Sequence, residues 1–163
     1  MRILGIDPGF ERLGIAILDP VVRERRGEKN HQVIFSECFK TSSKLPFSER
    51  LFLIGEEVRK IIKKYQPEIL AIETLFLNTN QKTVMRVAEA RGVVVYEASR
   101  AKLKIFEATP LQIKIATTGY GRSDKNQIMK MVKILVEIEK DKTSDDELDA
   151  VAIALTAFAY LRA

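Results

Sequence analysis

Two short apolar runs, each closed by a carboxylate, constrain the fold of this chain more than any other feature. Residues 3–7 are ILGID, with a Pro-Gly turn directly after Asp7, and residues 69–73 are ILAIE, which end on Glu73. Such runs indicate buried strands. In an open α/β sheet, sites form beyond the carboxyl ends of the strands. If these two strands are parallel neighbours, about 4.8 Å apart, Asp7 and Glu73 are able to share one ion.

The pattern along the rest of the chain predicts one α/β domain spanning residues 1–163. Three strands precede the first helix, so we expect a five-stranded mixed sheet whose first three strands are antiparallel, with helices on both faces. Apolar periodicity and turn residues place strands at 2–7, 11–18, 31–40, 69–73 and 102–107, and helices at 47–65, 79–100, 110–117, 124–138 and 145–161.

The expected helix at 79–100 carries an apolar stripe and an internal glycine. Gly92 predicts that another backbone packs closely there, because glycine weakens a helix interior. The stripe consists of Val84, Val87, Ala88, Arg91 and Val95.

Composition excludes several classes of site. The chain has a single cysteine, Cys38, and a single histidine, His31, so zinc sites and Ser-His or Cys-His catalytic units are not expected. The N-terminal apolar run is too short for a signal peptide, and the apolar segment 148–161 is too short to span a bilayer. We therefore expect a cytoplasmic protein without membrane contact.

Charge is distributed unevenly, although the net charge is only +5 and the pI about 9.3. Residues 111–134 hold five basic residues against one acid, whereas residues 137–149 hold seven acids against two lysines. A basic segment beside an acidic cluster indicates an anionic partner, and phosphate together with a metal ion is one explanation.

The acidic cluster begins the last helix. Ser144 and Glu147 form a capping-box pattern, and acids in a first helical turn complement the helix dipole, which explains much of the cluster without a function. Asp149 is different, because it enters an apolar helix and a buried carboxylate needs a partner. Asp146 shares its face and would repel it, so a cation between them removes the conflict.

Four carboxylates, Asp7, Glu73, Asp146 and Asp149, would make an all-oxygen site suited to Mg²⁺ or Mn²⁺. A single acid at a strand end more often marks only where the strand leaves the core. Glu107, at the end of the fifth expected strand, fits the same description and is not expected to be a ligand.

Five motifs in order resemble those of the RuvC family of Holliday-junction resolvases, endonucleases of the ribonuclease H-like fold. They are GIDPG with Gly14, AIETLF, AEARG, LQIKIATTGYGRSDKNQ and DELDAVAIAL, and together they cover essentially the whole chain. The resemblance implies a homodimer that nicks four-way DNA junctions symmetrically in recombination and repair. It implies Mg²⁺ as cofactor, with Mn²⁺ able to substitute and one or two ions per subunit, and a branch-migration complex as partner.

The resemblance also assigns roles to individual residues. Asp7, Glu73, Asp146 and Asp149 match the family's catalytic and metal-binding acids. Lys114 and Lys125 match two lysines that act at the DNA near the scissile phosphate, Lys125 with a catalytic role. Phe76 matches an aromatic that disturbs base stacking, although an apolar residue just past a strand is more often part of the core. Gly119, Gly121 and Arg122, in the loop between the two lysines, are further DNA-binding candidates and precede a helix N-terminus suited to phosphate. The family usually has Gly-x-Gly in the second strand, whereas here Gly14 is followed by Ala16.

Three alternatives stay open. The first is a ribonuclease H-like nuclease that acts on RNA or RNA–DNA hybrids. The second is a junction-binding protein without catalysis, which the presence of all four acids disfavours. The third is an ATP-binding member of the wider fold, such as a kinase. A kinase of that type needs two domains of this fold, and the chain is too short for both.

Overall fold

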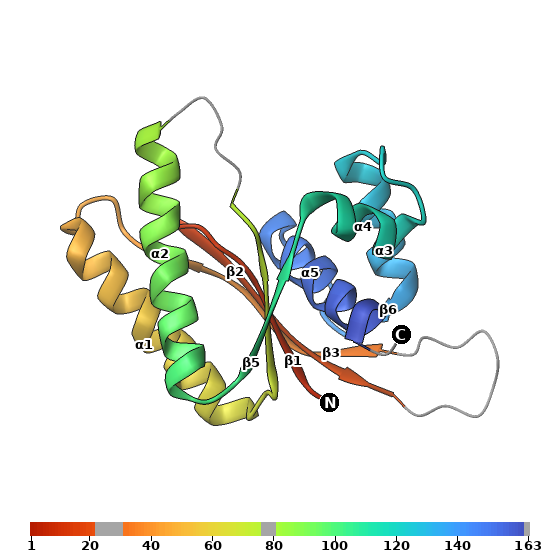
Figure 1. Ribbon diagram of the computed structural model, residues 1–163, viewed down its shortest axis with the longest axis horizontal. Helices are drawn as coiled ribbons and strands as arrows, with labels where there is room; N and C mark the ends of the chain where they lie inside the picture. Colours follow the sequence, from red (N-terminus) through yellow and green to blue (C-terminus); the bar gives the residue numbers. More distant parts are fainter. Residues whose placement is uncertain (22–30, 76–80, 162–163) are drawn as a thin grey trace.

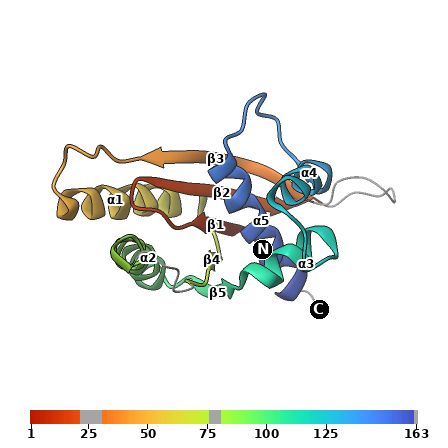
Figure 2. The same cartoon turned by 90° about the horizontal axis from the view of Figure 1, so that it is seen from above.

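The computed structural model describes residues 1–21, 31–75 and 81–161. The strands are β1 (Ile3–Asp7), β2 (Arg12–Pro20), β3 (His31–Lys40), β4 (Ile69–Glu73), β5 (Lys104–Ala108) and β6 (Val136–Glu137), and the helices are α1 (Phe47–Tyr65), α2 (Gln81–Arg100), α3 (Pro110–Thr118), α4 (Lys125–Leu135) and α5 (Asp145–Leu161). They form one sheet with the strand order β5-β4-β1-β2-β3-β6. Helices α1 and α2 lie against one face, and α3, α4 and α5 lie on the other (Figures 1 and 2).

Strand pairing confirms the expected mixed sheet. The first three strands are antiparallel, and β4 pairs in parallel with both β1 and β5. The register sets Ile6 beside Ile72, so that Asp7 and Glu73 follow at the same edge of the sheet. The parallel neighbours predicted from the two apolar runs are therefore present.

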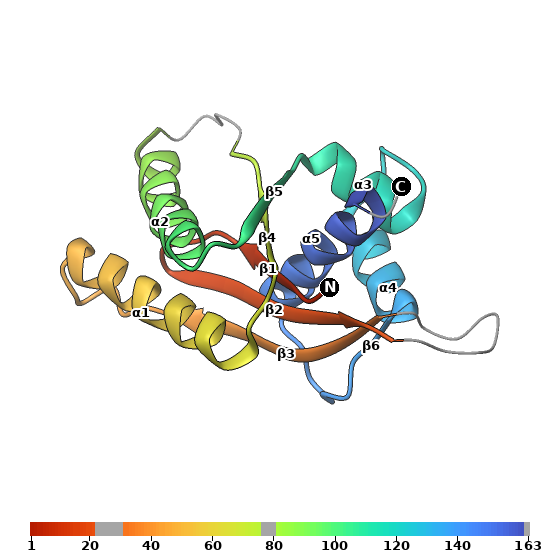
Figure 3. The same cartoon turned by 60° about the horizontal axis from the view of Figure 1, so that its bottom comes forward.

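Helix α5 occupies the centre of its layer, between the sheet and helices α3 and α4 (Figure 3). Residues 150–158 are buried without interruption, which explains why this helix is apolar around its whole circumference. No helix among the described residues is both long and apolar enough to cross a membrane.

Two glycines allow α5 to lie unusually close to the strands. A Cβ atom added at Gly5 of β1 would lie 2.2 Å from the carbonyl oxygen of Ala150, and one at Gly14 of β2 would lie 2.1 Å from that of Asp146. Since real Cβ atoms do not approach an oxygen so closely, any side chain at either position would push the helix away. The glycines thus fix how far the acidic start of α5 stands from the end of β1.

The sheet has six strands, one more than the sequence pattern predicts. The expected helix 124–138 ends at Leu135, and Val136 and Glu137 form β6, which pairs in parallel with the first residues of β3. Val136 is extended and fully buried, so tertiary burial of a β-branched residue ends the helix early. At the other edge, β5 begins at Lys104 rather than 102, because Lys102 has a positive φ of 62° in a turn.

Helix α2 differs from expectation in the face that it buries. Its buried positions are Ala90, Val94, Glu97 and Ala98, whereas the expected stripe is at most half-buried. Gly92 is exposed, and a Cβ atom there would meet nothing within 4 Å, so no described residue packs closely against Gly92. The apolar periodicity predicts a neighbouring face of the helix, because the face that is buried carries alanines and a glutamate. Glu97 is buried in ion pairs with Arg59 and Arg100.

We predict that Gly5→Ala lowers the free energy of unfolding by about 2 kcal/mol or more, since the added methyl group meets helix backbone that cannot move aside. Gly121→Ala is the matched control: there the methyl group meets only the end of the exposed Leu111 side chain, which can rotate away. Urea unfolding of both variants measures the difference. Equal losses in the two variants would contradict the close approach of α5 to β1.

Candidate active site

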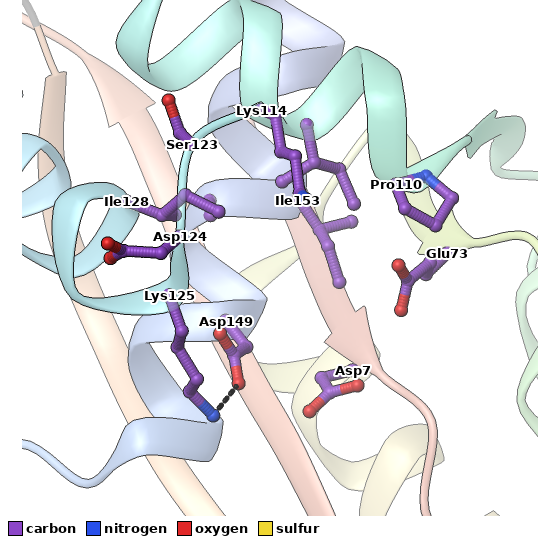
Figure 4. A pocket seen from close by; sticks show the side chains of 12 residues that line it. Asp7, Glu73, Pro110, Lys114, Ser123, Asp124, Lys125, Ile128, Asp149 and Ile153 are labelled. Atoms are coloured by element: carbon purple, nitrogen blue, oxygen red, sulfur yellow. Dashed lines mark hydrogen bonds and ion pairs between the residues drawn. The ribbon is translucent and has the colours of Figure 1, made fainter. Parts of the chain in front are cut away.

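Two of the expected acids lie at adjacent strand ends. Asp7 closes β1 and Glu73 closes β4, and both side chains are partly buried. They point into the same space at the carboxyl edge of the sheet (Figure 4). Their meeting follows directly from parallel pairing of the two apolar runs.

Helix α5 brings a third carboxylate, Asp149, to this space. The start of the helix is fixed by the expected capping box, in which the Ser144 amide donates to Glu147 over 3.1 Å and the Glu147 amide donates to the Ser144 hydroxyl over 3.4 Å. Glu147 is buried and also accepts hydrogen bonds of 2.6 Å from Ser36 of β3 and from Lys140. These contacts hold the first turn of α5 against the sheet and so orient Asp149. Ser36 and Lys140 are not predictable from the sequence, because no local pattern pairs them with Glu147.

The three acids line a cavity of about 320 Å³. Lys114 of α3 and Lys125 of α4 also line it, with Lys125 directly beside Asp149, so a ligand there meets acids and lysines together (Figure 4). A second cavity of about 270 Å³ lies toward α2 and shares Asp7 and Glu73 with the first. The two carboxylates thus stand on the boundary between two hollows.

Burial and mutual repulsion disfavour the charged forms of the three acids and so raise their pKa values. Burial, followed by the charges of Asp149 and Glu73, raises the pKa of Asp7 to about 7. Burial and the charge of Asp149 also raise the pKa of Glu73. Burial raises the pKa of Asp149 as well, although a hydrogen bond from Lys125 acts in the opposite direction. A cation in the cavity would relieve all three groups at once.

Lys125 already supplies part of this positive charge. Its ammonium group donates to Asp149 Oδ2 over 3.0 Å and lies 3.8 Å from Asp145. The hydrogen bond to Asp149 is the main cause that raises the pKa of Lys125. Lys125 therefore remains charged and faces the same carboxylate that a metal ion would use.

Asp146 does not line the cavity. Its Oδ2 atom accepts a 3.0 Å hydrogen bond from Arg12 Nε, a second from Arg12 Nη2, and a 3.4 Å contact from Cys38 Sγ. Burial alone would raise the pKa of Asp146, but these donors outweigh it and hold the pKa low. The cation expected between Asp146 and Asp149 is replaced here by two protein cations, Arg12 for one acid and Lys125 for the other.

The remaining DNA-binding candidates lie beside the cavity or outside the described residues. Gly119 ends α3 with a φ of 74°, and Gly121 and Arg122 continue the turn to α4, away from the cavity lining. The N-terminus of α4 is already capped, because Asp124 accepts a 2.9 Å hydrogen bond from the Gln127 amide, so a phosphate there would compete with a carboxylate. Phe76 falls outside the described residues.

The strand-end glutamate that is not expected to be a ligand lies apart from the three acids of the cavity. Glu107 of β5 forms an ion pair of 2.6 Å with Arg91 of α2 and does not line the cavity. A carboxylate at a strand end of this sheet therefore does not by itself reach the cavity.

The donor set fits a hard divalent cation. Among the described residues, the carboxylates of Asp7 and Glu73 receive neither a hydrogen bond nor an ion pair, although both are partly buried. Oxygen ligands without histidine or thiolate suit Mg²⁺. As they stand in the described ranges, no three His, Cys, Asp or Glu side chains form a group that could hold a metal ion. Asp7, Glu73 and Asp149 face the cavity, and Asp146 is the acid that stands apart.

Comparison with known proteins agrees with this geometry. The family model described as crossover junction endodeoxyribonuclease RuvC matches residues 3–157. The crossover junction endodeoxyribonuclease RuvC of Halothermothrix orenii is 43% identical over 155 residues, which cover 95% of this chain and 90% of the relative. That of Thermosipho melanesiensis is 42% identical over 154 residues, or 94% of each chain.

Solved structures extend the likeness to the fold. T. thermophilus RuvC in complex with a Holliday junction substrate has a TM-score of 0.89 at 29% identity, over 99% of this chain and 95% of that one. The yeast mitochondrial Holliday junction resolvase Ydc2, at 14% identity and a TM-score of 0.67 over 94% of this chain and 76% of that one, shares the fold. The family model matches nearly the whole of this chain, and relatives are more than 40% identical to it. This chain therefore belongs to the RuvC family of crossover junction endodeoxyribonucleases.

Proposed function

We propose that this protein is a structure-selective endonuclease that resolves four-way DNA junctions by Mg²⁺-dependent hydrolysis of phosphodiester bonds. The observation that carries the proposal is the cavity in which Asp7, Glu73 and Asp149 face Lys114 and Lys125. Its RuvC relatives are named as crossover junction endodeoxyribonucleases, and the T. thermophilus protein was solved with a Holliday junction substrate. The proposed activity would serve the recombination and repair of DNA in the cytoplasm.

The proposed metal ligands are Asp7, Glu73 and Asp149, with Asp146 as the fourth. One or two Mg²⁺ ions, for which Mn²⁺ is expected to substitute, would activate water and stabilise the leaving oxygen of the phosphodiester. The protein contributes the partly buried acids, whose pKa values are raised by burial first and by the charges of neighbouring acids second. It also contributes the apolar walls, formed by Ile113, Ile128 and Ile153, which limit water around the acids.

The two lysines provide the phosphate side of the site. Lys114 and Lys125 come from different helices and line the same cavity as the acids, so a phosphate between them would be held beside the carboxylates. Lys125 now donates to Asp149, and binding of a metal ion there would free its ammonium group for the phosphate. Gly119, Gly121 and Arg122 extend this basic side and are proposed to contact the DNA backbone beyond the cavity.

A nucleic-acid strand fits the arrangement better than a small substrate. Asp7 and Glu73 lie on the boundary of two cavities, so the site continues past the acids toward α2 instead of ending there. A strand that crosses this boundary places one phosphate at the acids and its neighbours in the hollows. An RNA–DNA hybrid is the second candidate substrate, and the experiment below separates the two.

A homodimer is the proposed assembly. Helix α2 exposes Met85 and Tyr96 on the side that also carries Gly92, and α1 exposes Phe52. Gly92 has no close neighbour in the part of the chain that the structure describes, so a second copy could pack against it. Two copies would provide the two sites that symmetric nicking of opposed strands needs. A branch-migration complex remains a proposed partner on the family resemblance alone.

We predict that Asp7→Asn abolishes Mg²⁺-dependent cleavage of a synthetic four-way junction and leaves junction binding intact or tighter, because it removes a metal ligand and one repelling charge. Glu107→Gln is the matched control, since it neutralises a strand-end acid that pairs with Arg91 outside the cavity. Cleavage assays and gel-shift assays measure the two properties. An RNA–DNA hybrid cut faster than the junction would reject the proposed substrate, and tight binding without cutting by the wild type would favour the non-catalytic alternative.

A second prediction follows from the raised pKa of Asp7. A raised pKa means that the folded state keeps a proton that the unfolded chain releases near pH 4, so Asp7 favours folding at low pH. Without metal, stability should fall as pH rises toward 7, by about 1.4 kcal/mol per pH unit for one proton, and level off above. Asp7→Asn should remove this loss and be more stable than wild type above pH 7. Urea unfolding in EDTA between pH 4 and pH 8 tests it; parallel curves would contradict it.

For the dimer, we predict that Tyr96→Glu yields monomers, because a charge would be buried at the interface. The control is Tyr120→Glu, which changes a tyrosine of similar exposure, 59% against 62%, in the turn between α3 and α4. Sedimentation velocity of both variants gives the mass in solution. A dimeric Tyr96→Glu, or a monomeric wild type, would place the interface elsewhere or remove it.

A further inference from the structure

Three donors converge on one oxygen atom of Asp146. Arg12 contributes Nε and Nη2, and Cys38 contributes Sγ, all to Oδ2. Arg12 and Cys38 come from β2 and β3, on the side of the sheet that α5 covers, since Gly14 beneath Asp146 pairs with Cys38. The carboxylate is therefore held toward these strands and away from the cavity.

The main chain of Asp146 nevertheless lies next to the acidic site. A Cβ atom at Gly14 would stand 2.1 Å from the Asp146 carbonyl oxygen and 3.1 Å from Asp7 Cβ, so both residues border the same glycine. Only the direction of the side chain separates Asp146 from the other three acids. This direction is set by the ion pair with Arg12, because Cys38 is a weak donor.

The ion pair is not needed to hold the helix. Arg12 is 54% exposed in its side chain, whereas α5 is anchored by its buried apolar residues and by Glu147. An exposed pair of this kind contributes little to folding. Its effect is local: it neutralises the one acid that would complete the all-oxygen site.

We propose that Arg12 is an internal competitor for the metal ion: its guanidinium engages Asp146 in the metal-free protein and must release it when the ion binds. The inference rests on the proposed metal site and deepens it, because it names a positioning residue that sets the affinity of the site. Arg12 acts through Asp146: the free energy of the ion pair between them must be overcome when the metal ion binds, and this lowers the apparent affinity of the site for the ion.

Calorimetric titration with Mn²⁺ tests the proposal without any cleavage measurement. Arg12→Gln is expected to bind Mn²⁺ about two- to fivefold more tightly than wild type, the range set by an exposed ion pair. Arg12→Lys keeps the charge and should stay near wild type. Arg100→Gln, which removes the same charge from the far end of α2, is the control for overall charge and should not change the affinity.

A double-mutant cycle separates competition for Asp146 from simple repulsion between Arg12 and the ion. In an Asp146→Asn background, the gain from Arg12→Gln should disappear, because no carboxylate remains to be released. A gain that persists there would overturn the proposal, and so would an unchanged or weaker affinity in Arg12→Gln alone. The proposed metal site requires that wild type binds Mn²⁺ saturably and that Asp7→Asn abolishes this binding. If either result is absent, the metal site fails together with this inference. Urea unfolding of Arg12→Gln checks that the fold is retained.

Discussion

The contact between the backbone of α5 and the two strands β1 and β2 is the constraint on which the rest of the structure depends. Gly5 and Gly14 leave no side chain between the helix and the sheet, so the carbonyl groups of Ala150 and Asp146 lie directly over the strands. This contact brings an acidic first turn to the carboxyl end of β1. Without it, Asp7 and Glu73 would be two strand-end acids without the third carboxylate.

Packing and electrostatics act against each other at this point. Close packing brings carboxylates together in a partly buried cavity, where burial and like charge raise the pKa of three of them. The chain balances the charge in part with Lys125 and Arg12, each paired to one acid of α5. Asp7 and Glu73 keep no such partner among the described residues, and they are the acids at which a cation would relieve most repulsion.

Much of this was predictable from local pattern. Asp7 and Glu73 could be predicted because apolar runs that end on an acid identify strand ends, and Asp149 because an acid in an apolar helix needs a partner. The pairing of Asp146 with Arg12 could not be predicted, since the two residues are 134 positions apart and meet only through the packing of α5 on β2. Strand β6 was missed for a similar reason: two residues carry no period, and burial against β3 decides their state. In α2, a buried Glu97 paired with two arginines hid the face that packs inward.

The burial of α5 on every side also limits how the protein can respond when an ion arrives. Residues 150–158 are enclosed by the sheet and two helices, so the helix has no room to slide or rotate as a body. Rearrangement of the acids is therefore left to torsions of individual side chains. If the proposed metal ion binds in the cavity, its loading would therefore not need α5 to move as a body.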